Sequence, residues 1–297
     1  MNSNNLVVAI IDGNGKIMNF QSLDEFQNGK KNIEILKCYA GRKLFNILVD
    51  EVGAIKYEDN KVALQSILEL NLYKSSMKLL GKVAEAVLVR ECKENSRLNK
   101  ICLSKARRML AKQSTVEKFE AIGTGLLSTR YKYPSKYNPS DTQRDIIWIN
   151  KENGCIAMMK DSNSTEGIEA GLQIKVSGNG INYFLKDLIN IRYEVPVVYF
   201  DICNDFDNVA EKLYIARKSE YKPDIIIGED FIKGSSLSYS AHMEILYYAE
   251  LIDALINGDI NPEELISGRP TLENKTLKNA LTATMLSEFN INNIILP

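Results

Sequence analysis

Apolar residues in the first half of this chain recur at helical spacing, and in its middle they form short runs typical of strands. Residues 61–112 contain no proline and a single glycine, Gly81, and their leucines and valines repeat as on one helix face, which predicts one or two long helices. The later runs predict strands at 145–149, 155–159, 171–176, 195–200 and 223–227, and helices at 181–190 and 206–218. A strand, a covering helix and another strand favour a crossover onto a mixed sheet.

The two ends of the chain differ from this centre. Two apolar runs, 6–11 and 16–20, flank Asp12-Gly13-Asn14-Gly15, which predicts a hairpin because Gly and Asn tolerate positive φ. Beyond Ser240 the pattern is helical, with breaks at Asn257-Gly258 and Gly268-Arg269-Pro270. We therefore expect an α/β protein with a mixed central sheet flanked by helices. Its expected regions are an N-terminal β-containing segment (1–60), an α/β core (61–235) and an acidic helical C-terminal region (236–297).

Polar residues interrupt two of the predicted strands in a way that suggests a site. Asp145 opens one strand, and Gln173 and Lys175 share a face of another because alternate strand residues point the same way. Oxygen ligands for a hard divalent cation beside a fixed positive charge suit phosphodiester hydrolysis. The alternative is structural, with Asp145 at a strand start and the other two on a solvated face. Ile147 and Ile149 favour a strand covered on both faces, where a lysine needs a partner.

These residues resemble the PD-(D/E)XK nuclease superfamily, in the restriction-endonuclease-like variant that has Gln in place of the second acid. The matching motifs are Asp145, Gln173-Ile174-Lys175 and, on the preceding helix, Gly81-Lys82-Val83-Ala84-Glu85, which is similar to that family's Gly-x-x-x-Glu. The resemblance covers roughly residues 70–230. It implies a nuclease-like core of a helix, hairpin strands, a helix and a strand, with Asp145, Gln173, Lys175 and Glu85 as catalytic residues.

A nuclease site of this kind implies a Mg²⁺ or Mn²⁺ cofactor. Asp145, the side-chain oxygen of Gln173 and the backbone carbonyl of Ile174 are the expected ligands, and Lys175 would orient or deprotonate the attacking water. The helix acid is open between two residues. Glu85 matches the motif but lies nearly opposite the apolar sector of the helix, whereas Glu91 lies inside that sector. Glu169 is a further candidate because it shares the strand face of Gln173.

Charge is distributed unevenly along a chain whose net charge is only −1. Residues 71–112 hold 11 Lys or Arg against three Glu, and residues 244–297 hold 8 acids against three bases. The basic stretch would attract a polyanion, although a solvated helix face explains it equally well. The tyrosine-rich loop 131–139 offers stacking and phosphate contacts, or tyrosines that simply pack it onto the core. The candidate nucleic-acid-binding residues there are Arg130, Lys132, Lys136 and Arg144.

Other kinds of chemistry fit the composition poorly. The five cysteines are widely spaced and His242 is the single histidine, so a zinc site and a Cys/His or Ser/His catalytic pair are disfavoured. The N-terminal apolar run lacks a basic start, and no apolar stretch approaches the ~18 residues of a membrane span. We expect a cytoplasmic protein that does not enter a membrane.

The sequence thus favours a metal-dependent nuclease, with DNA preferred over RNA as substrate and, by analogy, a bacterial or phage restriction or defence role. One alternative is a non-catalytic protein that keeps the nuclease-like fold and binds nucleic acid or a protein through its basic helix. Another is an interaction protein that assembles through its acidic C-terminal helices. A homo-oligomer and a regulatory protein partner are both compatible with the sequence.

Overall fold

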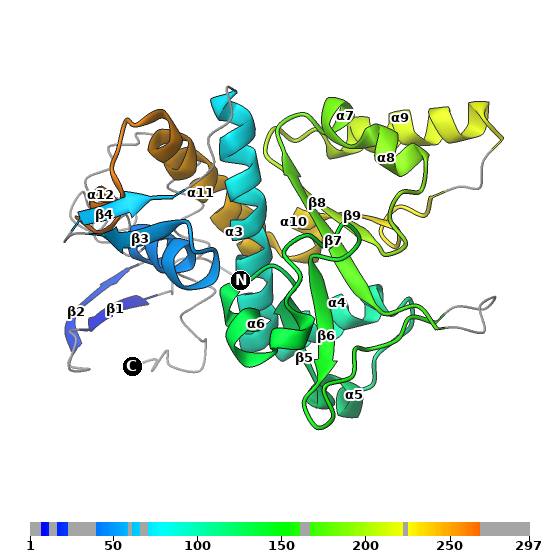
Figure 1. The fold of residues 1–297 in the computed structure, drawn as a ribbon, viewed down its shortest axis with the longest axis horizontal. Coiled ribbons are helices and arrows are strands. Elements are labelled where there is room, and N and C mark those ends of the chain that lie inside the picture. The colour runs from blue at the N-terminus through cyan, green and yellow to red at the C-terminus, as the bar shows by residue number, and fades with distance from the viewer. Residues whose placement is uncertain are drawn as a thin grey trace.

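A five-stranded mixed sheet with helices on both faces forms the centre of the molecule (Figure 1). The computed structural model describes residues 7–11, 17–22, 40–58, 61–65, 71–160, 167–221 and 225–267. The sheet consists of β5 (Phe119–Gly123), β6 (Ile146–Asn150), β7 (Gly171–Ser177), β8 (Val197–Asp201) and β9 (Phe231–Lys233), in that order. The expected fold class, a mixed central sheet flanked by helices, is therefore confirmed.

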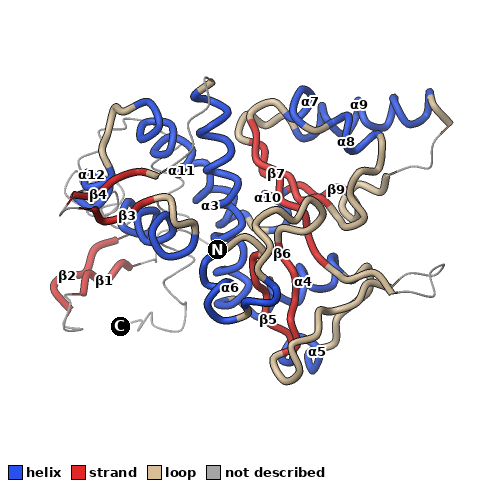
Figure 2. Tube along the Cα trace, viewed as in Figure 1, coloured by secondary structure: helices blue, strands red, loops and turns tan. Residues whose placement is uncertain are grey.

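The direction of the strands changes in the middle of this sheet. β6 runs antiparallel to β5 and β7, whereas β7, β8 and β9 are parallel. The connection from β7 to β8 contains two short helices, α7 (Gly180–Tyr183) and α8 (Leu185–Ile189), and α9 (Phe206–Ser219) follows β8. Figure 2 shows these three helices together beside the parallel half of the sheet. A helix-containing crossover is what a parallel pair of strands requires.

Each face of the sheet is buried against a different set of elements. Alternate residues such as Trp148, Leu172 and Ile174 join the main core with α3 (Leu72–Glu94) and α4 (Ser96–Ala106). On the opposite face Tyr199 and its neighbours pack in a second core with α7, α8 and α9. Ile122, Ile147 and Ile149 form a third, smaller cluster there. The prediction that the Asp145 strand is covered on both faces is thus confirmed.

Helix α3 lies between the sheet and α11 (Tyr239–Asn257). It packs on β5 and β7 and, more extensively, on α11 (Figure 1). Asn71 caps its N-terminus by accepting a hydrogen bond from the Lys74 backbone N–H at 3.2 Å. The other described elements are β1 (Val7–Ile11), β2 (Ile17–Ser22), the π-helical turn η2 (Ile47–Glu51), β3 (Ile55–Glu58), β4 (Lys61–Leu64), α5 (Gln113–Lys118), α6 (Leu127–Lys132), the 3₁₀ turn η3 (Pro134–Lys136), α10 (Gly234–Leu237) and α12 (Pro262–Ser267).

Several predicted elements are present as expected. β1 and β2 pair antiparallel, as the hairpin prediction requires, while the turn at 12–15 lies outside the described residues. The long helical stretch is α3 and α4, and the 206–218 helix is α9. α11 ends at Asn257, and the following Gly258 adopts a left-handed conformation (φ 80°), which confirms the predicted break there. The break at 268–270 lies outside the described residues, and the three expected region boundaries remain predictions.

Other predicted elements are wrong, and pairing between strands explains why. The first residues of the predicted 61–112 helix form β4, which pairs with β3. β5 was not expected, yet it pairs along the whole of β6. Residues 155–159 make only isolated bridges, because β7 itself pairs with the start of β6. Part of the predicted strand at 223–227 lies outside the described residues; of its described residues Ile227 alone makes a bridge, and the strand that pairs with β8 is β9. None of the helices in the described part of the chain has both the length and the apolar character needed to cross a bilayer.

Candidate functional site

Asp145 lies immediately before β6, and β7 holds its carboxylate. The Asp145 backbone N–H donates to the Leu172 carbonyl at 3.0 Å, which anchors the residue at the start of the pairing between the strands. Its Oδ2 then accepts two hydrogen bonds from β7, one from the Ile174 backbone N–H at 2.6 Å and one from Gln173 Nε2. The structure therefore brings Asp145 and Gln173 into direct contact on neighbouring strands.

Gln173 has one polar atom without a hydrogen-bond partner among the described residues. The side chain is 4% exposed, and although its nitrogen binds Asp145, Oε1 is buried without a hydrogen-bond partner. A buried amide oxygen left unpaired costs about 1–3 kcal/mol, so such groups call for a ligand, an ion or water. Amide oxygens are suitable ligands for hard divalent cations.

The backbone of Ile174 offers a third oxygen on the same side. The Gln173 backbone N–H donates to the Pro196 carbonyl at 3.0 Å, so Gln173 faces β8, while the Ile174 N–H faces Asp145. Because the N–H and C=O of a strand residue point to the same neighbour, the Ile174 carbonyl is also directed toward the Asp145 side. The residues thus fit a cation held by one carboxylate and two neutral oxygens. No cluster of three or more His, Cys, Asp or Glu side chains suited to a metal occurs among the described residues.

Lys175 lies beside this group of oxygens. Its side chain and that of Gln173 line the same hollow, as their spacing on β7 requires. The Lys175 Nζ lies 5.0 Å from the centroid of the Tyr193 ring, a cation–π distance. Burial lowers the pKa of Lys175, whereas the Asp145 carboxylate acts in the opposite direction. A lysine that loses its proton more readily than usual is suited to proton transfer.

The two acids near Lys175 are both harder to ionise than usual. Burial raises the pKa of Asp145 to about 6, against the opposing effects of the Ile174 hydrogen bond and of Lys175. Burial also raises the pKa of Glu85 well above its usual range, and the negative charge of Asp145 adds to this effect. A bound cation would favour the ionised forms of these two neighbouring carboxylates, so their raised pKa values are compatible with a cation-binding site.

Asp145, Gln173 and Lys175 line a hollow with a volume of about 400 Å³. One wall comes from the segment before β6 and from β7, and the other from α7, α8 and the loop after α8. Its lining residues are Asp141, Thr142, Asp145, Gln173, Lys175, Tyr183, Phe184, Asp187, Arg192 and Tyr193. The sequence predicts only Asp145, Gln173 and Lys175 of these; it gives no signal for Asp141 and Thr142 or for the last five residues. Only the crossover from β7 to β8 brings the last five opposite Lys175, and no spacing in the sequence signals it.

The three candidate helix and strand acids have different surroundings. Glu85 does not line the hollow, but it interacts electrostatically with Asp145 and Lys175 and has an Oε2 near Gly125. Glu91 is buried elsewhere, where it accepts hydrogen bonds from Ser238 Oγ at 2.5 Å and Ser240 Oγ at 2.8 Å. Glu169 forms an ion pair with Arg144. Of the three acids, the geometry thus favours Glu85.

The expected nucleic-acid-binding residues are largely engaged within the protein. Lys132 forms an ion pair with Glu120 at 2.7 Å, and Arg144 binds Glu169 and lies 3.5 Å from Asp141. The Arg130 guanidinium lies 5.8 Å from the centroid of the Tyr137 ring. Lys136 is half-buried on the turn η3. Phosphate contacts by Lys132 or Arg144 would therefore require the exchange of an existing ion pair.

Comparison with known proteins finds no match to this chain. No protein-family model matches the chain, and no curated protein or solved structure does either. The geometry and chemistry of the site are accordingly the basis on which a function is inferred.

Proposed function

We propose that the protein is a metal-dependent nuclease with a restriction-endonuclease-like core, which hydrolyses phosphodiester bonds of nucleic acid, with DNA as the favoured substrate. The observation that carries the proposal is the buried, unpaired Oε1 of Gln173 beside the Asp145 carboxylate. An oxygen-rich position next to a desolvated acid is suited to a hard divalent cation such as Mg²⁺ or Mn²⁺. A cytoplasmic protein of restriction or defence is the setting that this activity suggests.

Each residue has a role in this proposal. Asp145, Gln173 Oε1 and the Ile174 carbonyl would hold the cation, which would supply polarisation of the phosphate and acidification of water. Lys175 takes a proton from the attacking water or offsets negative charge that develops on the phosphate. Glu85 supports the charge balance from α3. Because Gln173 contributes no charge, this site is expected to bind its cation more weakly than a site with two acids.

The test is cleavage of plasmid and single-stranded oligonucleotides with Mg²⁺, Mn²⁺ or EDTA. We expect metal-dependent cleavage that Lys175→Ala reduces by at least ~10²-fold, as is typical for loss of a general acid–base group. Gln173→Glu should tighten binding of the cation, because it adds a charged ligand. Cleavage by Lys175→Ala at the wild-type rate, or no cleavage by the wild type with any metal, would refute the proposal.

Lys233 provides a matched control. It lies in the same row of the sheet as Lys175, since both are register partners of Tyr199. Its Nζ also lies over an aromatic ring, 5.4 Å from the centroid of Phe206, but Lys233 does not line the hollow. Lys233→Ala should therefore reproduce the packing change without loss of cleavage. Equal losses in the two variants would assign the effect of Lys175 to folding.

A further inference from the structure

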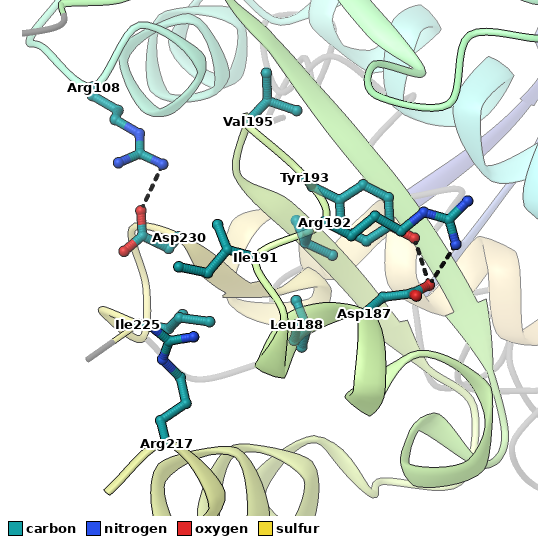
Figure 3. Close-up of a pocket in the computed structure, with 11 residues that line it drawn as sticks. Arg108, Asp187, Leu188, Ile191, Arg192, Tyr193, Val195, Arg217, Ile225 and Asp230 are labelled. Atoms are coloured by element: carbon teal, nitrogen blue, oxygen red, sulfur yellow. Dashed lines mark hydrogen bonds and ion pairs between the residues drawn. The ribbon is translucent and has the colours of Figure 1, made fainter. Parts of the chain in front are cut away.

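A second hollow adjoins the first one and shares a wall with it. It has a volume of about 190 Å³, and Asp187, Arg192 and Tyr193 line both hollows. Figure 3 shows the Arg192 guanidinium and the Tyr193 hydroxyl directed at the Asp187 carboxylate, with bonds of 3.0 and 3.1 Å. The Lys175 ammonium lies over the ring of Tyr193. A ligand in the second hollow would therefore be separated from the proposed catalytic lysine by the Tyr193 side chain alone.

The second hollow combines apolar walls with guanidinium groups. Its apolar residues are Leu188, Ile191, Val195, Val197 and Ile225, and its arginines are Arg108, Arg192 and Arg217. Arg108 and Arg192 are ion-paired, with Asp230 at 2.9 Å and with Asp187. A hollow whose cations are mostly neutralised is poorly suited to a multiply charged phosphate. It is suited to a flat, largely apolar group with hydrogen-bonding edges.

Ile191 has an unusual backbone conformation in this wall. It follows the end of α8, where its N–H donates to the Leu188 carbonyl at 3.1 Å and the Arg192 N–H donates to the Asp187 carbonyl at 3.0 Å. These two bonds define a Schellman motif, whose left-handed position normally holds glycine. Ile191 occupies that position with φ +48°. A β-branched residue is a true outlier there, and strain of this kind is concentrated at functional sites.

The strain at Ile191 is not explained by packing within the protein. Its side chain is 56% exposed, so it gains little from burial. What it does provide is an apolar surface in the second hollow, facing Leu188 and Ile225 (Figure 3). A side chain kept in an unfavourable conformation and mostly in solvent suggests contact with a ligand.

We propose that the second hollow binds a nucleobase of the nucleic acid whose phosphate lies at Lys175, with Ile191 against the face of the base. This inference rests on the proposed function. The hollow is smaller than the ~300–1,000 Å³ of sites for drug-sized ligands, which fits one ring system rather than a whole nucleotide. Guanidinium edges donate to base acceptors, and apolar side chains and arginines pack on base faces. The neighbouring Lys175 hollow remains open for the phosphate.

The experiment measures base binding separately from hydrolysis. A single-stranded oligonucleotide that carries 2-aminopurine and a terminal fluorescein is titrated with the full chain in EDTA. Aminopurine emission is expected to rise as the base leaves its stacked neighbours, and fluorescein anisotropy reports total binding. Ile191→Gly should weaken binding by about tenfold, the scale for loss of one base contact. The same variant should bind an oligonucleotide of abasic sites as the wild type does.

Ile215 is the matched control, because it is an isoleucine on α9 with 57% exposure that does not line the hollow. Ile215→Gly would weaken α9, so the paired comparison uses Ile191→Trp and Ile215→Trp. Only the first should abolish the rise in aminopurine emission. Binding without any aminopurine signal, equal effects of the two Trp variants, or equal losses on abasic and normal oligonucleotides would overturn the proposal.

Hydrolysis of bis(p-nitrophenyl) phosphate, which has no nucleobase, separates this inference from the proposed function. Metal-dependent hydrolysis of this compound without an aminopurine signal would remove the base site and keep the nuclease. An aminopurine signal without hydrolysis of any substrate would keep the base site and remove the nuclease. Absence of both would remove both.

Discussion

Replacement of Asp145 by Asn should stabilise the metal-free protein. Asn has the shape of Asp and retains an oxygen that can accept from the Ile174 N–H, but it carries no charge. The Asp145 carboxylate is buried next to Glu85, so its ionised form lowers the stability of the fold when no cation is present. Asp145→Asn therefore removes an unfavourable charge while it preserves the local hydrogen bond.

The size of the stabilisation expected for Asp145→Asn follows from the pKa of the Asp145 carboxyl. Burial raises it from 3.8 to about 6. Since one pKa unit is worth ~1.4 kcal/mol, the upper limit for the stabilisation by Asp145→Asn is about 3 kcal/mol. Screening by water in the open hollow brings the expected stabilisation to about 1–3 kcal/mol at pH 7.5.

The sign of the pH dependence follows from the same shift. Between pH 3.8 and about 6 the folded state binds the proton more readily than the unfolded chain does. The stability deficit is therefore full above pH 6 and is relieved as the pH falls toward 3.8. The raised pKa of Glu85 acts in the same direction.

Urea unfolding in EDTA at pH 7.5 and pH 5 measures both effects. We expect Asp145→Asn to be more stable than the wild type at pH 7.5 and the difference to shrink at pH 5. Asp207→Asn is the control, because the Asp207 side chain is 83% exposed. Mg²⁺ should stabilise only the wild type, by mass action. A destabilised Asp145→Asn in EDTA, or a difference that is the same at both pH values, would refute the reasoning.

Two further predictions concern stability alone. Glu91→Ala should lower the free energy of unfolding by about 2–3 kcal/mol, because it leaves the Ser238 and Ser240 hydroxyls without their acceptor. Glu91→Gln keeps one acceptor oxygen and should lower the free energy of unfolding by less. Equal urea midpoints for the two variants would contradict this prediction. Ile191→Gly should raise the free energy of unfolding by about 1 kcal/mol, because glycine adopts the left-handed conformation without a steric penalty. A lower melting temperature for Ile191→Gly would show that the side chain packs more than its exposure indicates.

Much of the site could be predicted because strand periodicity is local. The two-residue spacing of Gln173 and Lys175 places both side chains in one hollow, and Asp145 adjoins them because β6 and β7 pair. The helical spacing of apolar residues predicted α3 and α4 for the same reason, because this spacing is also a local pattern. In each case neighbouring residues determine which way a side chain points.

The features that the sequence did not predict depend on contacts between distant parts of the chain. β5 was missed because its strand character comes from pairing with β6 rather than from its own alternation. Glu85 was placed on the solvent side of its helix because a wheel assumes one buried face, whereas α3 is covered by the sheet and by α11. Asp187, Arg192 and Tyr193 reach the site only through the crossover, so no local pattern could identify them.

The position of α3 also affects how the molecule unfolds. Within two turns of this helix, Glu85 interacts with Asp145 beside the sheet, while Arg90 and Glu91 bind Glu244, Ser238 and Ser240 around α11. The helix thus connects the site to α11 within the main core, which contains buried residues of α3, of α11 and of the sheet, and this core cannot lose α3 and remain packed. The site and the α11 region should therefore melt in one cooperative transition, and amide exchange should protect the middle of α3 as strongly as β7.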